Sequence, residues 1–148
     1  MIRAIVDTNV LASGFIGFTT PASTPGAIVR AWQDDQFELV VSEPIIVELE
    51  HTFLDPYFTR RLSAQDRLDA VTLLRTQAVI TAITVSVQGV ATHPEDDVIL
   101  ATAVTYANHT ASPVWLVTGD KQLQKLDTYQ EVQIVSPPDF LIVLSQQP

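Results

Sequence analysis

Apolar positions along the chain recur with two different periods. Short apolar runs bounded by turn-forming residues are typical of buried strands, and apolar positions three and four apart are typical of helices. The expected strands cover residues 2–6, 37–41, 82–87, 114–117 and 132–135. The expected helices begin at Thr24-Pro25, at Ser42, at Ser63 and near Asp97, and two more cover 121–126 and 138–144.

Strands that alternate with helices favour a parallel sheet with helices on both faces. We therefore predict an α/β fold: a three-layer α/β/α sandwich with a central parallel sheet of four to five strands, in a single domain over residues 1–148. The segment from Ser13 to Gly26 has three Gly and two Pro, so we expect a long loop there. The alternation over residues 82–87 predicts a strand with one wet face.

Motifs at the expected helix starts support these boundaries. Thr24-Pro25 combines a capping hydroxyl with proline at the first helical position. Ser63 to Asp66 resembles a capping box with Asp in place of the usual Glu. Ser42 is expected to cap the helix that follows it.

Four carboxylates are expected to meet at one edge of this sheet. Asp7 and Asp120 each follow an apolar run, and Asp97 and Glu48 lie in or near the first turns of helices that leave the same edge. Ligands of open α/β sheets bind at the carboxyl ends of the strands. Clustered carboxylates repel one another, so the pattern indicates a bound cation or a shared proton.

Composition narrows the class of site. The chain has no cysteine, so a thiolate zinc site is excluded, and carboxylates without a histidine pair suit Mg²⁺ or Mn²⁺ better. The net charge of −9 disfavours broad non-specific binding to nucleic acid, but bound cations would reverse the charge locally. No apolar run approaches the roughly 20 residues that span a bilayer, and we expect a cytoplasmic protein with no membrane contact.

Four short motifs occur in order along nearly the whole chain. They are Asp7-Thr8-Asn9-Val10, Ser42 with Glu48-Leu49, Asp97 before Leu100-Ala101-Thr102-Ala103, and Val117-Thr118-Gly119-Asp120. In this order they resemble a PIN domain, in particular the VapC-like toxins of prokaryotic toxin–antitoxin pairs. The resemblance implies a metal-dependent endoribonuclease that has RNA as its substrate, a cognate antitoxin as its partner and a homodimer as its assembly.

The resemblance also assigns roles to residues. The acids implied as catalytic and metal-binding, with one or two Mg²⁺ or Mn²⁺ ions, are Asp7, Glu48, Asp97 and Asp120. The implied supporting residues are Asn9, Thr118 and Asp96. We expect Asp7 to be the central ligand, Glu48 to bind metal or orient the attacking water, and Thr118 to hydrogen-bond a ligand carboxylate.

Two other classes of α/β protein also have acids at their strand ends, and the chain lacks residues that each of them needs. A receiver domain needs a phospho-accepting Asp after its third strand, and residues 82–88 supply no acid. A phosphatase of the haloacid dehalogenase type needs Asp-x-Asp after its first strand, where Asn9 takes the place of the second acid. The alternative that stays open is a catalytically silent PIN-like module that binds RNA or a protein.

Overall fold

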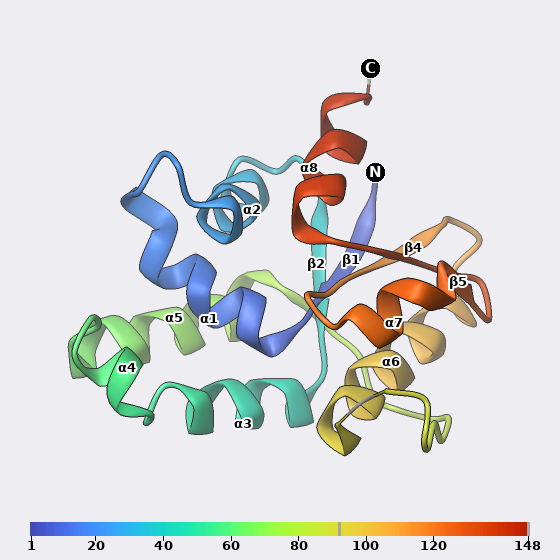
Figure 1. The fold of residues 1–148 in the computed structure, drawn as a ribbon, viewed down its shortest axis with the longest axis horizontal. Helices are drawn as coiled ribbons and strands as arrows, with labels where there is room; N and C mark the ends of the chain where they lie inside the picture. Colours follow the sequence, from blue (N-terminus) through green and yellow to red (C-terminus); the bar gives the residue numbers. More distant parts are fainter. Residues whose placement is uncertain (92, 148) are drawn as a thin grey trace.

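The strands form one mixed sheet in the computed structural model, which describes residues 1–91 and 93–147 (Figure 1). The strands are β1 (Arg3–Val6), β2 (Glu38–Val41), β3 (Val79–Ile80), β4 (Val114–Val117), β5 (Thr128–Tyr129) and β6 (Val132–Val135). Their order across the sheet is β3-β2-β1-β4-β6-β5. Neighbouring strands run parallel except for β5, which pairs with β6 in the antiparallel sense.

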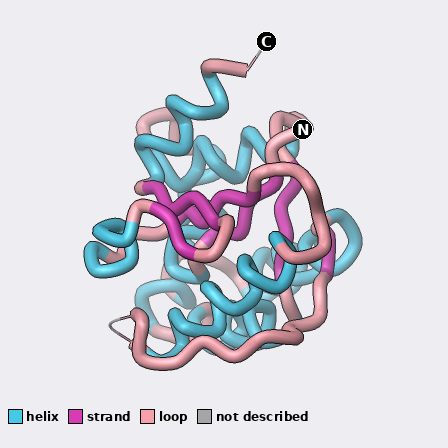
Figure 2. Tube along the Cα trace, turned by 90° about the vertical axis from the view of Figure 1, so that its right-hand side faces the viewer, coloured by secondary structure: helices cyan, strands magenta, loops and turns pink. Residues whose placement is uncertain are grey.

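Helices flank the sheet on both sides, so the predicted α/β/α layering is confirmed (Figure 2). The helices are α1 (Thr8–Ile16), α2 (Thr24–Gln33), α3 (Glu43–Thr52), α4 (Pro56–Thr59), α5 (Ala64–Gln77), α6 (Pro94–Ala107), α7 (Lys121–Leu126) and α8 (Pro137–Ser145), with the 3₁₀ turn η1 (Gly17–Thr19). Helix α2 packs against α1 and α8, and α3 packs against α1, α5 and α6.

The central strands β1 and β4 are almost entirely apolar because both faces of the sheet are covered. Their register pairs Val6 with Val117, the last residue of each strand. The chain therefore leaves both strands at the same edge, and Asp7 and Thr118 become neighbours. The backbone N–H of Asp7 extends this pairing by donating to the carbonyl of Val117 at 2.8 Å.

The predicted loop from Ser13 to Gly26 is wrong, because α1 continues to Ile16 and only a short turn separates η1 from α2. The glycines of this segment serve helix packing instead of loop mobility. A Cβ built on Gly26 would overlap the backbone carbonyl of Gly17, so α2 approaches the end of α1 more closely than any side chain would permit. Ser23, one residue before the expected cap, accepts from the N–H of Gly26 at 3.0 Å.

Residues 82–87 do not form the predicted strand; the strand at this edge is β3, two residues long. The alternation has another cause. Ile83, Val85 and Val87 are partly buried while the residues between them are exposed. The segment therefore lies along the core with one side exposed to solvent. Strand β5 was also not predicted, and with β3 it makes the sheet six strands wide instead of four to five.

The helix starts agree with the sequence in part. Ser63 and Asp66 form the predicted capping box. Ser42 occupies the capping position of α3 but makes no capping hydrogen bond there. Its hydroxyl, fully buried, lies 2.9 Å from that of Thr102, so Ser42 ties α3 to α6 instead. None of the described helices is long and apolar enough to cross a bilayer.

Candidate functional site

Asp7 is a buried acid at the carboxyl edge of the sheet. It caps α1, and its side chain is only 6% exposed. Its Oδ1 accepts from the backbone N–H of Asn9 at 3.3 Å, and its Oδ2 accepts from the hydroxyl of Thr118 at 2.8 Å. These contacts fix the orientation of the carboxylate at the end of β1.

Burial raises the pKa of Asp7 above its ordinary value, and the negative charge of Asp120 raises it further. Hydrogen bonds from Thr118 and from the backbone N–H groups of Asn9 and Thr8 oppose this rise but do not cancel it. The carboxylate of Asp7 is therefore electrostatically unfavourable in the ionised form. A proton or a nearby cation would relieve that cost.

Thr118 links the two acids that follow β1 and β4. The backbone N–H of Asp120 donates to the hydroxyl oxygen of Thr118 at 3.0 Å, while the same hydroxyl donates to Asp7. Asp120 in turn caps α7, and its Oδ1 accepts from the N–H groups of Gln122 at 2.8 Å and Leu123 at 3.1 Å. The relative placement of Asp7 and Asp120 thus depends on one buried hydroxyl group.

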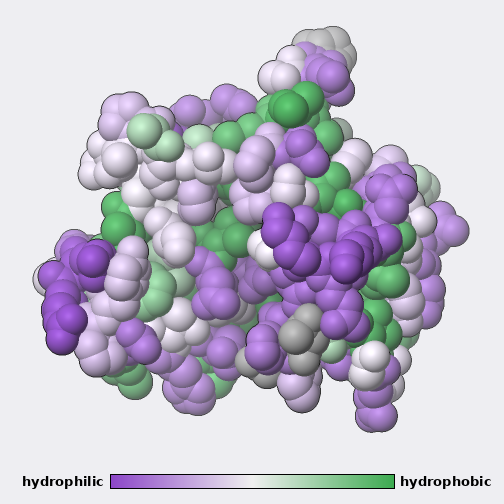
Figure 3. Space-filling view, viewed as in Figure 1, coloured by the Kyte–Doolittle hydropathy of each residue, from purple (hydrophilic) through white to green (hydrophobic). Residues whose placement is uncertain are grey.

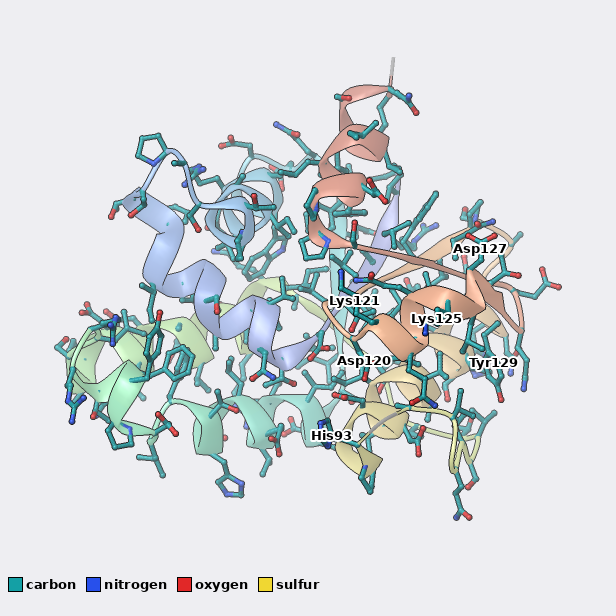
Figure 4. All side chains as sticks on the ribbon, viewed as in Figure 1. His93, Asp120, Lys121, Lys125, Asp127 and Tyr129 are labelled. Atoms are coloured by element: carbon teal, nitrogen blue, oxygen red, sulfur yellow. The ribbon has the colours of Figure 1, made fainter. Side chains whose placement is uncertain are left out.

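These acids face a cavity of about 530 Å³, which we call the acidic hollow. The polar or charged side chains that line it include Asp7, Asn9, His93, Asp96, Asp120 and Lys121. Figure 4 shows Asp120 and Lys121 at the start of α7 and His93 near the start of α6. Hydrophilic residues also gather over α7 on this face of the molecule (Figure 3). The hollow combines acids with one lysine and one histidine.

Glu48 lies outside the acidic hollow. It lines a smaller cavity of about 170 Å³ together with Thr8 and Val98. The Thr8 hydroxyl is buried without a hydrogen-bond partner among the described residues. Such a group usually binds water or a ligand, because an unsatisfied buried hydroxyl is costly. Glu48 and Thr8 are the polar residues of this second, mostly apolar pocket, which is distinct from the one that Asp7 lines.

Asp97 is buried, with 7% of its surface exposed, and its carboxylate is engaged by the segment before α6. It accepts from the backbone N–H groups of Gly89 at 2.9 Å, Val90 at 3.2 Å and Ala91 at 2.8 Å. Asp97 is not among the described residues that line the acidic hollow, whereas its neighbour Asp96 is.

The structure thus brings together two of the four expected acids, Asp7 and Asp120, and adds Asp96 to them. Within residues 1–91 and 93–147, no group of three or more acidic or histidine side chains is already arranged to hold a metal ion. The sequence predicted that Asn9, Thr118 and Asp96 support the site of Asp7. Asp7, Asn9 and Asp96 line the acidic hollow, and Thr118 donates a hydrogen bond to the carboxylate of Asp7.

Two further polar residues at the site were not predicted. The sequence gives Thr8 no role beyond its place in the Asp7-Thr8-Asn9-Val10 motif, because an unpartnered hydroxyl can be identified only when its burial is known. Gln122 lines the acidic hollow, and its side-chain amide donates to the carbonyl of Val90 at 2.8 Å. No local sequence signal marks a surface glutamine as a tie between two segments 32 residues apart.

This chain is similar in sequence to a known protein family and in fold to a solved structure. A model of the PIN domain matches residues 3–122, which include Asp7, Glu48, Asp97 and Asp120. The fold is similar to a chain in the crystal structure of VapBC2 from Rickettsia felis bound to a DNA fragment from their promoter. That alignment has a TM-score of 0.56 and 9% identity, and it covers 91% of this chain and 98% of the other. No curated protein sequence matches this chain.

Proposed function

Because the chain belongs to the PIN domain family, we propose that it is a metal-dependent endoribonuclease that hydrolyses RNA phosphodiester bonds with Mg²⁺ or Mn²⁺. The observation that supports this most is the pairing of Asp7 with Asp120 across a shared Thr118 hydroxyl. A carboxylate whose pKa is raised by burial and, to a smaller extent, by a second acid is a candidate functional group and not only a structural one.

The donor set fits a hydrated divalent cation. Mg²⁺ is usually bound through one or two carboxylates and keeps several waters, so it needs no cage of protein ligands. Asp7 and Asp120 supply two such carboxylates, and Asp96 lines the same hollow. This arrangement supports one ion held by Asp7 and Asp120, and a second ion would need a contribution from Asp96 or Glu48. When bound, the cation supplies Lewis-acid chemistry at the phosphodiester.

The protein groups around this position have separable tasks. Thr118 holds the carboxylate of Asp7 in one orientation, and the capping bonds of Asp120 hold that carboxylate at the start of α7. Lys121 and His93 line the acidic hollow and provide donors for a phosphate oxygen. We assign to Glu48, which lines the same small cavity as the unpartnered Thr8 hydroxyl, the task of holding and orienting a water molecule.

The proposal extends to a biological role. The similarity of fold to a chain of VapBC2, together with the resemblance to VapC-like toxins, supports an antitoxin partner for this chain. We propose that the protein acts in the cytoplasm as the toxin of a toxin–antitoxin pair, and that it forms a homodimer. The net charge of −9 implies that RNA is held by the cation and a few donors, and not by a broad basic surface.

Cleavage of labelled single-stranded RNAs tests the proposal. The protein is incubated with Mg²⁺, with Mn²⁺ and with a chelator, and Asp7→Asn and Asp120→Asn are compared with Asp34→Asn, an exposed acid at the end of α2. We expect cleavage with either metal by the wild type and Asp34→Asn, and none in chelator or by the two site variants. A pure protein that binds these RNAs but cuts none of them with either metal is instead the silent module.

A further inference from the structure

The carboxylate of Asp97 holds the segment that precedes α6. Asp97 accepts hydrogen bonds from three consecutive backbone N–H groups, those of Gly89, Val90 and Ala91, at distances of 2.8–3.2 Å. Gly89 has a φ of +70°, a left-handed conformation that glycine adopts without strain. Successive N–H groups that converge in this way form an anion-binding concavity, and here the anion comes from the protein itself.

The same segment is tied to α7 on its other side. The side-chain amide of Gln122 donates to the carbonyl of Val90 at 2.8 Å, and the backbone N–H of Gln122 donates to the carboxylate of Asp120 at 2.8 Å. The N–H and the carbonyl of Val90 therefore face different partners. A continuous series of hydrogen bonds runs from Asp97 through Val90 and Gln122 to Asp120.

We propose that Asp97 is a positioning residue that acts on Asp120 through residues 89–91 and Gln122, and that Asp96 is the α6 acid that faces the cation. The proposal rests on the proposed function, because it assigns roles within the same site. Three observations support the proposal: among the described residues, the Asp97 carboxylate accepts from the N–H groups of residues 89–91, Asp97 does not line the acidic hollow, and Asp96 does.

This assignment departs from the role that the resemblance gives to Asp97. A direct ligand must present its carboxylate to the hollow, and in Asp97 that carboxylate faces the backbone of the preceding segment. An acid that holds ligand-bearing segments in place still has a large effect on metal affinity, since the loss of such a partner commonly costs about 10–100-fold. Loss of activity in an Asp97 variant would therefore not separate the two roles.

Amide hydrogen exchange on the metal-free protein separates them without any need for activity. We compare Asp97→Asn and Gln122→Ala with Gln65→Ala, an exposed glutamine on α5. Both test variants should speed exchange at Leu123, whose N–H bonds to Asp120, by about fivefold to tenfold, the effect of one net hydrogen bond. Wild-type exchange at Leu123 in both overturns the proposal. Gln122 is exposed, so Gln122→Ala keeps the test available if Asp97→Asn does not fold.

A double-mutant cycle on Mn²⁺ affinity gives the second readout. If Asp97 and Gln122 act along one series of contacts, each single variant should lower the Mn²⁺ affinity by about 10–100-fold. The double variant should then bind Mn²⁺ no more weakly than the weaker-binding of the two single variants. Asp96→Asn should lower the affinity without changing exchange at Leu123. Abolished binding in Asp97→Asn with wild-type affinity in Gln122→Ala would make Asp97 a direct ligand. If the wild type itself binds no Mn²⁺, the proposed function fails, and the exchange result still decides the role of Asp97.

Discussion

The hydroxyl of Thr118 donates to Oδ2 of Asp7 at 2.8 Å, a buried contact between residues 111 positions apart. The same hydroxyl oxygen accepts from the N–H of Asp120. Parallel pairing of β1 with β4 makes this contact possible, because it ends both strands at the same level. One threonine thereby connects the fold of the sheet to the placement of two acids.

Thr118→Val keeps the shape of the side chain and removes the hydroxyl. It removes the hydrogen bond that Oδ2 of Asp7 accepts and the hydroxyl oxygen to which the N–H of Asp120 donates, so we expect the free energy of unfolding to fall by about 1–3 kcal/mol. Mn²⁺ affinity should fall by about 10–100-fold, since the orientation of Asp7 is lost. Chemical denaturation and calorimetric titration measure the two effects. Thr118→Ser, which retains the hydroxyl, should lie close to the wild type in affinity, and equal losses in both variants would contradict the assigned role.

Asp7→Asn should stabilise the metal-free protein at neutral pH. The unfolded carboxyl titrates near 3.8, and burial raises the pKa of Asp7 in the folded protein. Between those two values the folded state binds the extra proton, so the contribution of Asp7 to the free energy of unfolding falls as the pH rises. Asparagine does not titrate, so the advantage of the variant should grow as the pH rises through this window and then remain constant.

Denaturation of wild type and Asp7→Asn in the presence of chelator, at a series of pH values, measures that difference. Comparing the two proteins at each pH cancels the contributions of the other acids. A variant that is less stable than the wild type at every pH would show that the hydrogen bonds of the Asp7 carboxylate outweigh its cost of burial.

Gly26→Ala should destabilise the protein through the contact between α1 and α2. The added Cβ overlaps the backbone carbonyl of Gly17, which cannot rotate away as a side chain could, and overpacking of this kind costs about 1–3 kcal/mol. Gly119→Ala is the matched control, because a Cβ at that position would meet no atom of the described residues within 4 Å, apart from its chain neighbours. Thermal unfolding of both variants tests this explanation of the glycines, and equal melting temperatures would refute it.

Periodicity was sufficient to predict the strands β1, β2 and β4, because a strand buried on both faces is a nearly continuous apolar run, and β6, because its apolar positions alternate with the exposed Gln133. It failed at α1, where glycine and proline were interpreted as a loop although they permit close helix packing. It also failed at residues 82–87, because any extended segment lying on a core alternates, whether or not it has a strand partner.

The candidate site, like the fold, could be predicted from the sequence only in part. Asp7, Asp120 and Thr118 could be placed from the strand ends, since parallel topology fixes which ends coincide. The partners of Asp97 could not, because they are backbone groups of residues 89–91, and the sequence does not record where an irregular segment places its N–H groups. The hydrogen bond from Gln122 to Val90 depends on the position of the same segment, so it could not be predicted from the sequence either.

A divalent-cation site at Asp7 and Asp120 is the claim on which the proposed chemistry depends. Calorimetric titration of Mn²⁺ into wild type, Asp7→Asn and Asp34→Asn tests it most directly. We predict saturable binding of the same affinity in wild type and Asp34→Asn, and loss of that binding in Asp7→Asn. Equal binding by all three proteins, or no binding by the wild type, would contradict it.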